Sequence, residues 1–169
     1  MKRKTKISLL IAMTACMIPF MASALKANLF YSTFLSPADG PYIETYLAVV
    51  GSSIEYRIND NGKYQGAVEI TMIFKKDNEV NNFKKYELLS PEVNDPSEVD
   101  FNFLDQQRFA LPNGVYDFNI IISDKHKDTI PYLITEPVKI DFPINEVAVS
   151  GIQLVDSYSK ADGEGILNK

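Results

Sequence analysis

Apolar and polar residues alternate along most of this chain with a period of two, which is the spacing of a β-strand with one buried face. The clearest run covers residues 64–75. Tyr64, Gly66, Val68, Ile70, Met72 and Phe74 share one face of this run, and Gln65, Glu69, Thr71 and Lys75 share the other. We therefore predict a strand here whose even-numbered face lies in the core.

The same pattern recurs in short segments separated by turn-forming residues. Further strands are predicted over 28–35, 41–50, 54–58, 82–89, 116–123 and 131–142, around Phe103 and Phe109, and over 147–155. Residues 36–40 and 59–62 are rich in Ser, Pro, Asn, Asp and Gly, and Asp77-Asn78 is a pair that tolerates positive φ. We expect tight turns at all three places.

The number and spacing of these strands indicate the fold class. About seven to nine short strands, with no convincing helical period between them, favour an antiparallel sandwich over a fold of alternating strands and helices. The sequence therefore predicts an all-β chain with an immunoglobulin-like or fibronectin type III-like β-sandwich.

The octapeptide 111–118, Leu-Pro-Asn-Gly-Val-Tyr-Asp-Phe, is typical of a turn that leads into a late strand. A tyrosine near the start of such a strand forms a tyrosine corner when its hydroxyl bonds to upstream backbone. We predict a structural corner made by Leu111, Gly114 and Tyr116. The same register places Phe118, Ile120 and Ile122 in the core.

The first 24 residues have the organisation of a signal peptide. Lys and Arg in residues 2–6 precede an apolar stretch over 7–20, and Ala22 and Ala24 are the small residues that signal peptidase prefers. We expect cleavage before Leu25. The predicted organisation is then a signal peptide over 1–24, a sandwich domain over 25–143, and a linker or the start of a following domain over 144–169.

Cys16, the only cysteine, suggests an alternative processing route. The small residue Ala15 before it is compatible with a bacterial lipoprotein signal and a lipid anchor at Cys16, but the apolar stretch continues beyond it, where a polar tether is expected. Cleavage before Leu25 would leave no cysteine and no disulfide. The core alone would then have to hold the fold in an oxidising compartment.

The net charge expected after cleavage disfavours some classes of binding partner. Loss of residues 1–24 removes four of the 17 basic residues and no acid, which leaves 13 basic against 22 acidic residues and a net charge of −9. Such a surface repels nucleic-acid phosphates and anionic lipids. We expect no nucleic-acid partner, and membrane contact only through a lipid at Cys16.

Few residues suggest catalysis or metal binding. His126, the sole histidine, lies beside Ser123, Asp124 and Asp128, but a hydrolytic triad is assembled from separate loops. The oxygen-rich segments 59–62 and 156–164 do not match a calcium-binding loop. We predict no catalytic residue, no cofactor and no metal ion.

Tyrosine is abundant, with nine residues, whereas tryptophan is absent. Exposed aromatic rings bind sugars by stacking, and Tyr42, Tyr46, Tyr56 and Tyr132 are the candidates here. Alternating strand positions more often place such rings in half-buried packing. An exposed sheet edge is a further means of binding a partner.

Several segments together resemble a known family. The runs 41–47 (PYIETYL), 64–68 (YQGAV) and 105–109 (DQQRF), followed by 111–116, are similar in order and spacing to secreted GWxTD-domain proteins of Gram-negative bacteria. The resemblance covers roughly residues 29–155 and implies the β-sandwich region on the N-terminal side of that family. The Gly-Trp-x-Thr-Asp motif is absent, so we expect a fragment or a stand-alone relative. The family provides no catalytic residue to transfer.

We therefore expect a non-enzymatic exported module of the bacterial cell envelope, with a structural or interaction role. Its location would be periplasmic, outer-membrane-associated or extracellular, and its partner an envelope protein or a glycan. A carbohydrate-binding module is the first alternative, and an accessory domain of a hydrolase is the second.

Overall fold

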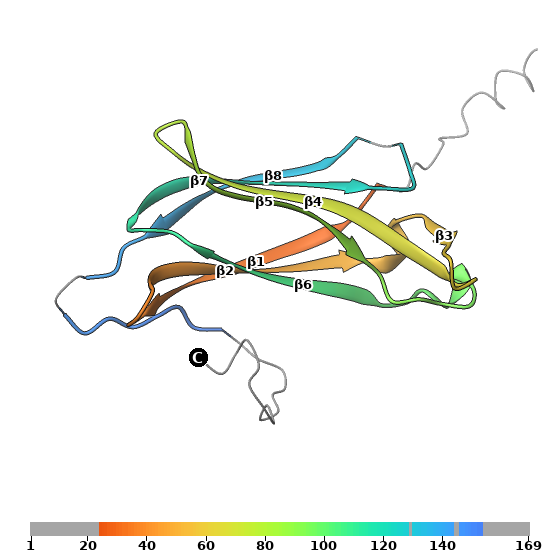
Figure 1. Ribbon diagram of the computed structural model, residues 1–169, viewed down its shortest axis with the longest axis horizontal. Helices are drawn as coiled ribbons and strands as arrows, with labels where there is room; N and C mark the ends of the chain where they lie inside the picture. The colour runs from red at the N-terminus through yellow and green to blue at the C-terminus, as the bar shows by residue number, and fades with distance from the viewer. Residues whose placement is uncertain (1–23, 129, 144–145, 154–169) are drawn as a thin grey trace, which may run out of the picture.

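The computed structural model describes residues 24–128, 130–143 and 146–153, which form two antiparallel β-sheets packed face to face (Figure 1). One sheet has three strands in the order β1 (Ala27–Ser36), β2 (Gly40–Val50) and β6 (Asn102–Ala110). The other has five: β3 (Tyr56–Ile58), β4 (Tyr64–Lys76), β7 (Gly114–Asp124) and β8 (Tyr132–Ile140) in that order, with β5 (Glu79–Leu89) also paired to β4. Two 3₁₀ turns, η1 (Gly51–Ser53) and η2 (Pro96–Glu98), complete the described elements. The predicted antiparallel β-sandwich is confirmed.

The strand order is that of an immunoglobulin-like fold. β7 lies between β4 and β8, as the sixth strand of an immunoglobulin domain lies between the third and the last. β1, β2 and β6 form the opposing sheet. The chain therefore crosses between the sheets after β2, again between β5 and β6, and a third time between β6 and β7.

The core contains the side chains that the alternation predicts. The fully buried side chains include Val68, Ile70, Met72 and Phe74 of β4, Ile120 and Ile122 of β7, and Val138 of β8. Only 1% of Phe118 and of Ile140 is exposed. Phe74 joins the two sheets, because its ring centroid lies 4.4 Å from that of Phe118 and 4.9 Å from that of Phe109 on β6. Burial of this apolar surface is the main force holding the sheets together.

The predicted turns are also present. Asp77 and Asn78 have φ of 55° and 66° and form the two-residue connection between β4 and β5. Gly62 has φ of 71° in the loop that closes β3 onto β4, where the Asn59 N–H donates to the Lys63 carbonyl at 2.8 Å. Positive φ explains the residue types, because Gly, Asn and Asp reach this conformation at the lowest cost.

One predicted strand is wrong over its described part. Residues 147–153 form no strand, although they approach β1. The Gly151 N–H donates to the Thr33 carbonyl at 2.7 Å, and the Leu35 N–H donates to Ser150 Oγ at 3.1 Å. Val147 and Ile152 are largely exposed, whereas Ala148 is partly buried against the core. Residues 154 and 155 of the prediction lie outside the described residues.

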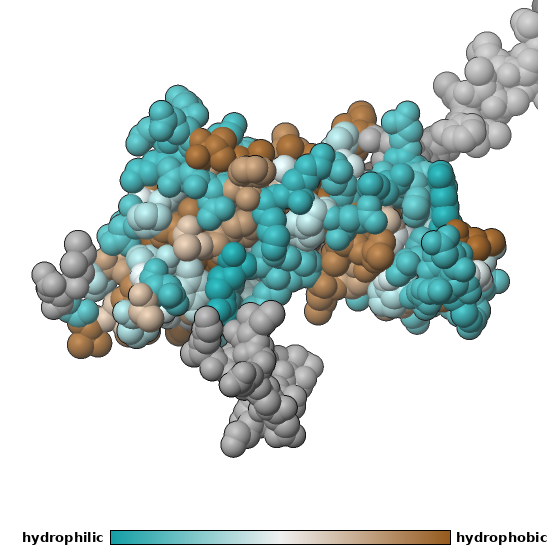
Figure 2. Space-filling model, viewed as in Figure 1, coloured by the Kyte–Doolittle hydropathy of each residue, from teal (hydrophilic) through white to brown (hydrophobic). Residues whose placement is uncertain are grey.

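Polar side chains bridge the two sheets along their β5–β6 side. Asn82 Nδ2 donates to the Ala110 carbonyl at 3.2 Å, and the Tyr86 hydroxyl bonds the carboxylate of Asp105. These bridges fix the spacing of two sheet edges that share no backbone ladder. Figure 2 shows a molecular face that is mostly hydrophilic, with hydrophobic side chains at several separate places.

The first residues after the predicted cleavage point pack into the sandwich. Leu25 belongs to the core with 8% of its surface exposed, and the Lys26 N–H donates to Ser53 Oγ at 3.0 Å. Residues 1–23, with Cys16 and most of the predicted signal peptide, lie outside the described part. Within that part, no helix is long and apolar enough to cross a bilayer.

Candidate functional site

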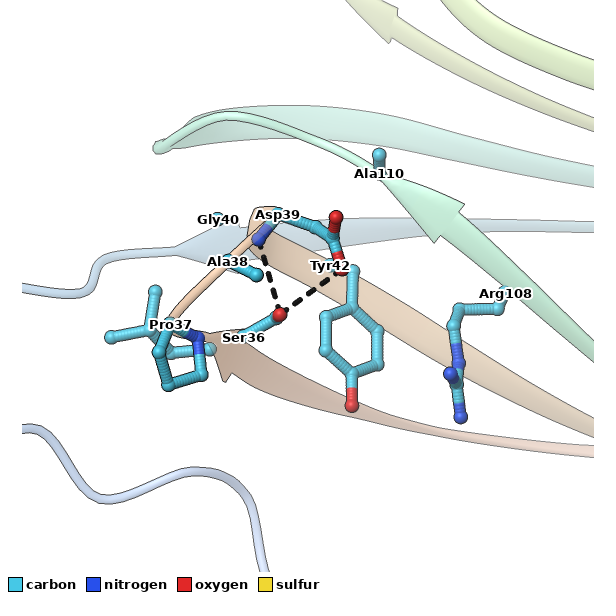
Figure 3. Close-up of a pocket in the computed structure, with 9 residues that line it drawn as sticks. Ser36, Pro37, Ala38, Asp39, Gly40, Tyr42, Arg108 and Ala110 are labelled. Carbon is cyan, nitrogen blue, oxygen red and sulfur yellow. Dashed lines mark hydrogen bonds between the residues drawn. The ribbon is translucent and has the colours of Figure 1, made fainter. Parts of the chain in front are cut away.

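A cleft of about 670 Å³ lies on the outer face of the three-stranded sheet, beside the turn that joins β1 to β2 (Figure 3). Ser36 and Asp39 hold this turn, because Ser36 Oγ accepts from the Asp39 N–H at 3.1 Å and donates to its carboxylate at 3.2 Å. Gly40 ends the turn with φ of 85°, which a side chain would disfavour. The turn-forming sequence thus builds one wall of the cleft.

Tyr42 and Arg108 line the other side of the cleft, and Phe34 stacks on the Tyr42 ring. The Phe34 and Tyr42 ring centroids lie 5.4 Å apart, and the Arg108 guanidinium carbon lies 4.9 Å from the Tyr42 centroid. Phe34 belongs to β1 and Arg108 to β6, which flank β2 on opposite sides, so both faces of the Tyr42 ring are covered. Figure 3 shows Tyr42 and Arg108 projecting side by side. A cation over a tyrosine ring is a favourable contact at a partly exposed site.

Glu44 fixes the position of Arg108. Its side chain is 7% exposed although it points away from the core, and it forms an ion pair with the Arg108 guanidinium. Gln106 Nε2 donates to the same carboxylate at 3.2 Å, and the Tyr46 hydroxyl bonds it as well. Burial and then the hydrogen bond to Glu44 raise the pKa of Tyr46. The buried charge is therefore satisfied by three partners, which is what makes its burial tolerable.

The cleft presents both hydrogen-bond donors and acceptors. Arg108 has five N–H donors, and its pair with Glu44 uses only part of them. Its side chain is 41% exposed, and the Asp39 carboxylate stands on the opposite rim. Such a site suits a ligand that offers carbonyl, carboxylate or hydroxyl oxygens to Arg108 and a donor to Asp39.

The residues predicted to form the tyrosine corner come together near one end of the sandwich. The Tyr116 hydroxyl donates to the Pro112 carbonyl at 2.7 Å, and both Tyr116 and Leu111 are 1% exposed. The Leu111 N–H donates to the Pro41 carbonyl at 3.2 Å, which continues the pairing of β6 with β2. Gly114 begins β7, where a Cβ would lie 2.9 Å from Lys76 Nζ. The corner connects structural elements and does not line the cleft.

Asn113 adds a contact that the sequence did not suggest. Its Nδ2 donates to the Phe142 carbonyl at 2.6 Å, and its Oδ1 accepts from the Phe142 N–H at 3.0 Å. The Asn-Gly pair indicated only a turn. The side chain also ties that turn to the segment after β8, a partner about 30 residues away that no local pattern reveals.

The Ser-Asp-His segment has a structural arrangement. The Asp124 carboxylate accepts from the backbone N–H of Glu55 at 2.8 Å and from the backbone N–H of His126 at 2.9 Å. Arg57 donates to the His126 carbonyl. The carboxylate thus holds two loops through their backbones and does not orient the imidazole, as a catalytic triad requires. Over the described ranges, no three His, Cys, Asp or Glu side chains are grouped to hold a metal ion.

The four candidate sugar-binding tyrosines do not form one platform. Tyr42 and Tyr46 lie on the outer face of β2 and are half-buried. Tyr56 is half-buried on β3, where its enclosed hydroxyl has no hydrogen-bond partner, and burial raises its pKa. Tyr132 lies on β8 of the other sheet. Only Tyr42 contributes to the cleft.

Comparison with protein-family models, with curated proteins and with solved structures found no match. The resemblance to GWxTD-domain proteins therefore stays a prediction.

Proposed function

We propose that the chain is a non-enzymatic exported interaction module of the bacterial cell envelope, and that it binds an envelope protein in the cleft beside Tyr42 and Arg108. The observation that supports this proposal is the stack of Phe34, Tyr42 and Arg108, with Arg108 oriented by the buried Glu44. Aromatic residues and arginine are the side chains that contribute most to protein interfaces. A stack that is already ordered loses little entropy when a partner binds.

Two features favour an exported location. The signal-peptide pattern of residues 1–24 predicts export, and the resemblance to GWxTD-domain proteins implies a Gram-negative envelope. Leu25 is the first described residue of the core, so cleavage before it would leave the folded part whole. A lipid at Cys16 would instead hold the same domain at a membrane through a short tether.

Site-specific photocrosslinking in the cells that produce the full chain tests this function. A photoreactive residue at Ala38, exposed on the cleft rim, is expected to trap a partner, whereas one at Lys139, exposed on β8, is not. The double substitution Glu44→Gln with Arg108→Gln, which leaves no unpaired charge, should abolish the Ala38 adduct. The absence of an adduct at Ala38, or the same adduct from both positions, would show that the cleft does not bind a partner.

Carbohydrate binding is the second candidate, and the aromatic Tyr42 beside Asp39 and Arg108 favours it. Because both ring faces are covered, a sugar would bond the polar groups around Tyr42 and would not stack on it. Titration with soluble peptidoglycan fragments distinguishes this function. A glycan module should lose binding in Tyr42→Ala and keep it in Tyr132→Ala, and wild-type protein that binds no fragment rules it out for this ligand.

A further inference from the structure

A second depression, of about 440 Å³, lies on the outer face of the three-stranded sheet. Its apolar lining comes from all three strands, with Phe30 on β1, Tyr46 and Ala48 on β2, and Leu104 on β6. Phe30 is 68% exposed and Leu104 is 76% exposed, and they lie on the two strands that flank β2, so apolar surface is uncovered on both sides of that strand. None of these residues lines the cleft beside Arg108.

The C-terminal part of the described chain leads to this depression. Ser150 and Gly151 bond the backbone of β1 at Leu35 and Thr33. Two residues later, the side-chain amide of Gln153 lies against the Tyr46 hydroxyl, with 2.9 Å between Gln153 Oε1 and the hydroxyl oxygen, and Tyr46 is one of the lining residues. Residues 150 and 151 thus lie along the edge of β1, and the side chain of Gln153 reaches the outer face of the sheet at Tyr46.

The two residues that follow Gln153 are apolar and therefore suit an apolar depression. Leu154 and Val155 come directly after Gln153, and residues 156–165 are mostly polar or glycine. One residue spans at most about 3.6 Å, so Leu154 and Val155 follow within about 7 Å of a residue that already contacts the lining. We propose that this depression binds the continuation of the same chain through Leu154 and Val155. The proposal goes beyond the function above, because no residue of the cleft takes part.

Disulfide trapping tests this contact. The full chain carrying Cys16→Ser receives one cysteine pair, Leu104→Cys with Leu154→Cys, and is oxidised with diamide. Each disulfide takes two hydrogens from the thiols and reduces one diamide to its hydrazine. We expect an intramolecular disulfide to form at least tenfold faster than in the control pair Leu133→Cys with Leu154→Cys, whose Leu133 is exposed on the other sheet. Equal rates would overturn the proposal.

A double-mutant cycle provides a second measurement without a cross-link. Leu154→Ser should lower the thermal midpoint of the full chain but should have no further effect when Leu104→Ser is already present. An equal decrease in both backgrounds, or no decrease in either, would show that the two side chains do not meet. Circular dichroism of each variant confirms that the sandwich is folded.

Discussion

Glu44 occupies an outward-facing position of β2, yet only 6% of the residue is exposed. Arg108, Gln106 and Tyr46 surround its carboxylate and replace the water that it would otherwise bind. The acidic side chain therefore positions the guanidinium beside Tyr42. At the scale of single residues, a charge that has no role in the core determines the geometry of the cleft.

The tyrosine corner makes a specific prediction. Tyr116→Phe removes the hydroxyl that donates to the Pro112 carbonyl, and we expect a loss of about 1 kcal/mol in the free energy of unfolding. Urea unfolding measures this loss. Tyr132→Phe on the exposed part of β8 is the matched control and should leave stability unchanged. A Tyr116→Phe variant as stable as the wild type would mean that the hydrogen bond does not stabilise the fold.

Four tyrosines predict how stability depends on alkaline pH. Burial raises the pKa of Tyr46, Tyr56, Tyr86 and Tyr116, and hydrogen bonds to carboxylates raise the pKa of Tyr46 and Tyr86 further. The folded chain therefore retains phenol protons that the unfolded chain releases near pH 10, the ordinary pKa of tyrosine. Their contribution to stability is complete below about pH 10 and is lost as the pH rises above it.

Thermal unfolding between pH 8 and pH 11 measures this effect. The wild-type midpoint should fall steeply above pH 10, and Tyr86→Phe should show a shallower fall because it lacks one of the four tyrosines with a raised pKa. An identical slope in the variant would mean that Tyr86 does not contribute. Tyr132→Phe again serves as the control.

At the scale of elements, the β4–β5 hairpin depends on two residues with positive φ. Asn78 has φ of 66°, a conformation that costs most L-residues about 1–2 kcal/mol. Asn78→Val should lower the free energy of unfolding by about that amount, whereas Asn78→Gly should be neutral or slightly stabilising. Chemical unfolding of both variants measures the difference. Equal stabilities would show that this turn is not strained by a β-branched residue.

The edge strands differ in how open they are to further pairing. β8 is an edge strand whose central Pro137 lacks an N–H group, which interrupts the row of donors on that edge. β1 is also an edge strand, but Gly151 already bonds it at Thr33. Strand addition is therefore less suited to these two edges than binding on the outer face of the sheet.

At the scale of the whole molecule, Phe74 makes the two sheets one cooperative unit. It contacts Phe109 on the opposing sheet and Phe118 on its own. Phe74→Ala should lower the free energy of unfolding by about 3–5 kcal/mol, because it leaves a cavity between the sheets. Phe83→Ala, at a position that is 65% exposed, should change it by less than about 0.5 kcal/mol.

Guanidinium unfolding followed by tyrosine fluorescence and by circular dichroism measures both variants. The two signals should change together in Phe74→Ala, as in the wild type, since both sheets share this core. Separate transitions would mean that each sheet is stable without the other.

The alternation of residues by itself determined most strands, the buried face of β4 and the two-residue turn at Asp77-Asn78. Each of these depends on neighbours within a few positions, so a local pattern carries the information. The hydroxyl partner of Tyr116 also lies four residues upstream, within reach of the same local reasoning.

Only the tertiary structure decided which strands became neighbours, and the cleft depends on that choice. Tyr42 and Arg108 lie far apart in the sequence, and they meet because β6 pairs with β2 across the chain. Glu44 is buried for the same reason. Residues 147–153 have the pattern of a strand but form none, because they bond β1 through the Gly151 N–H and the Ser150 side chain and not through a backbone ladder.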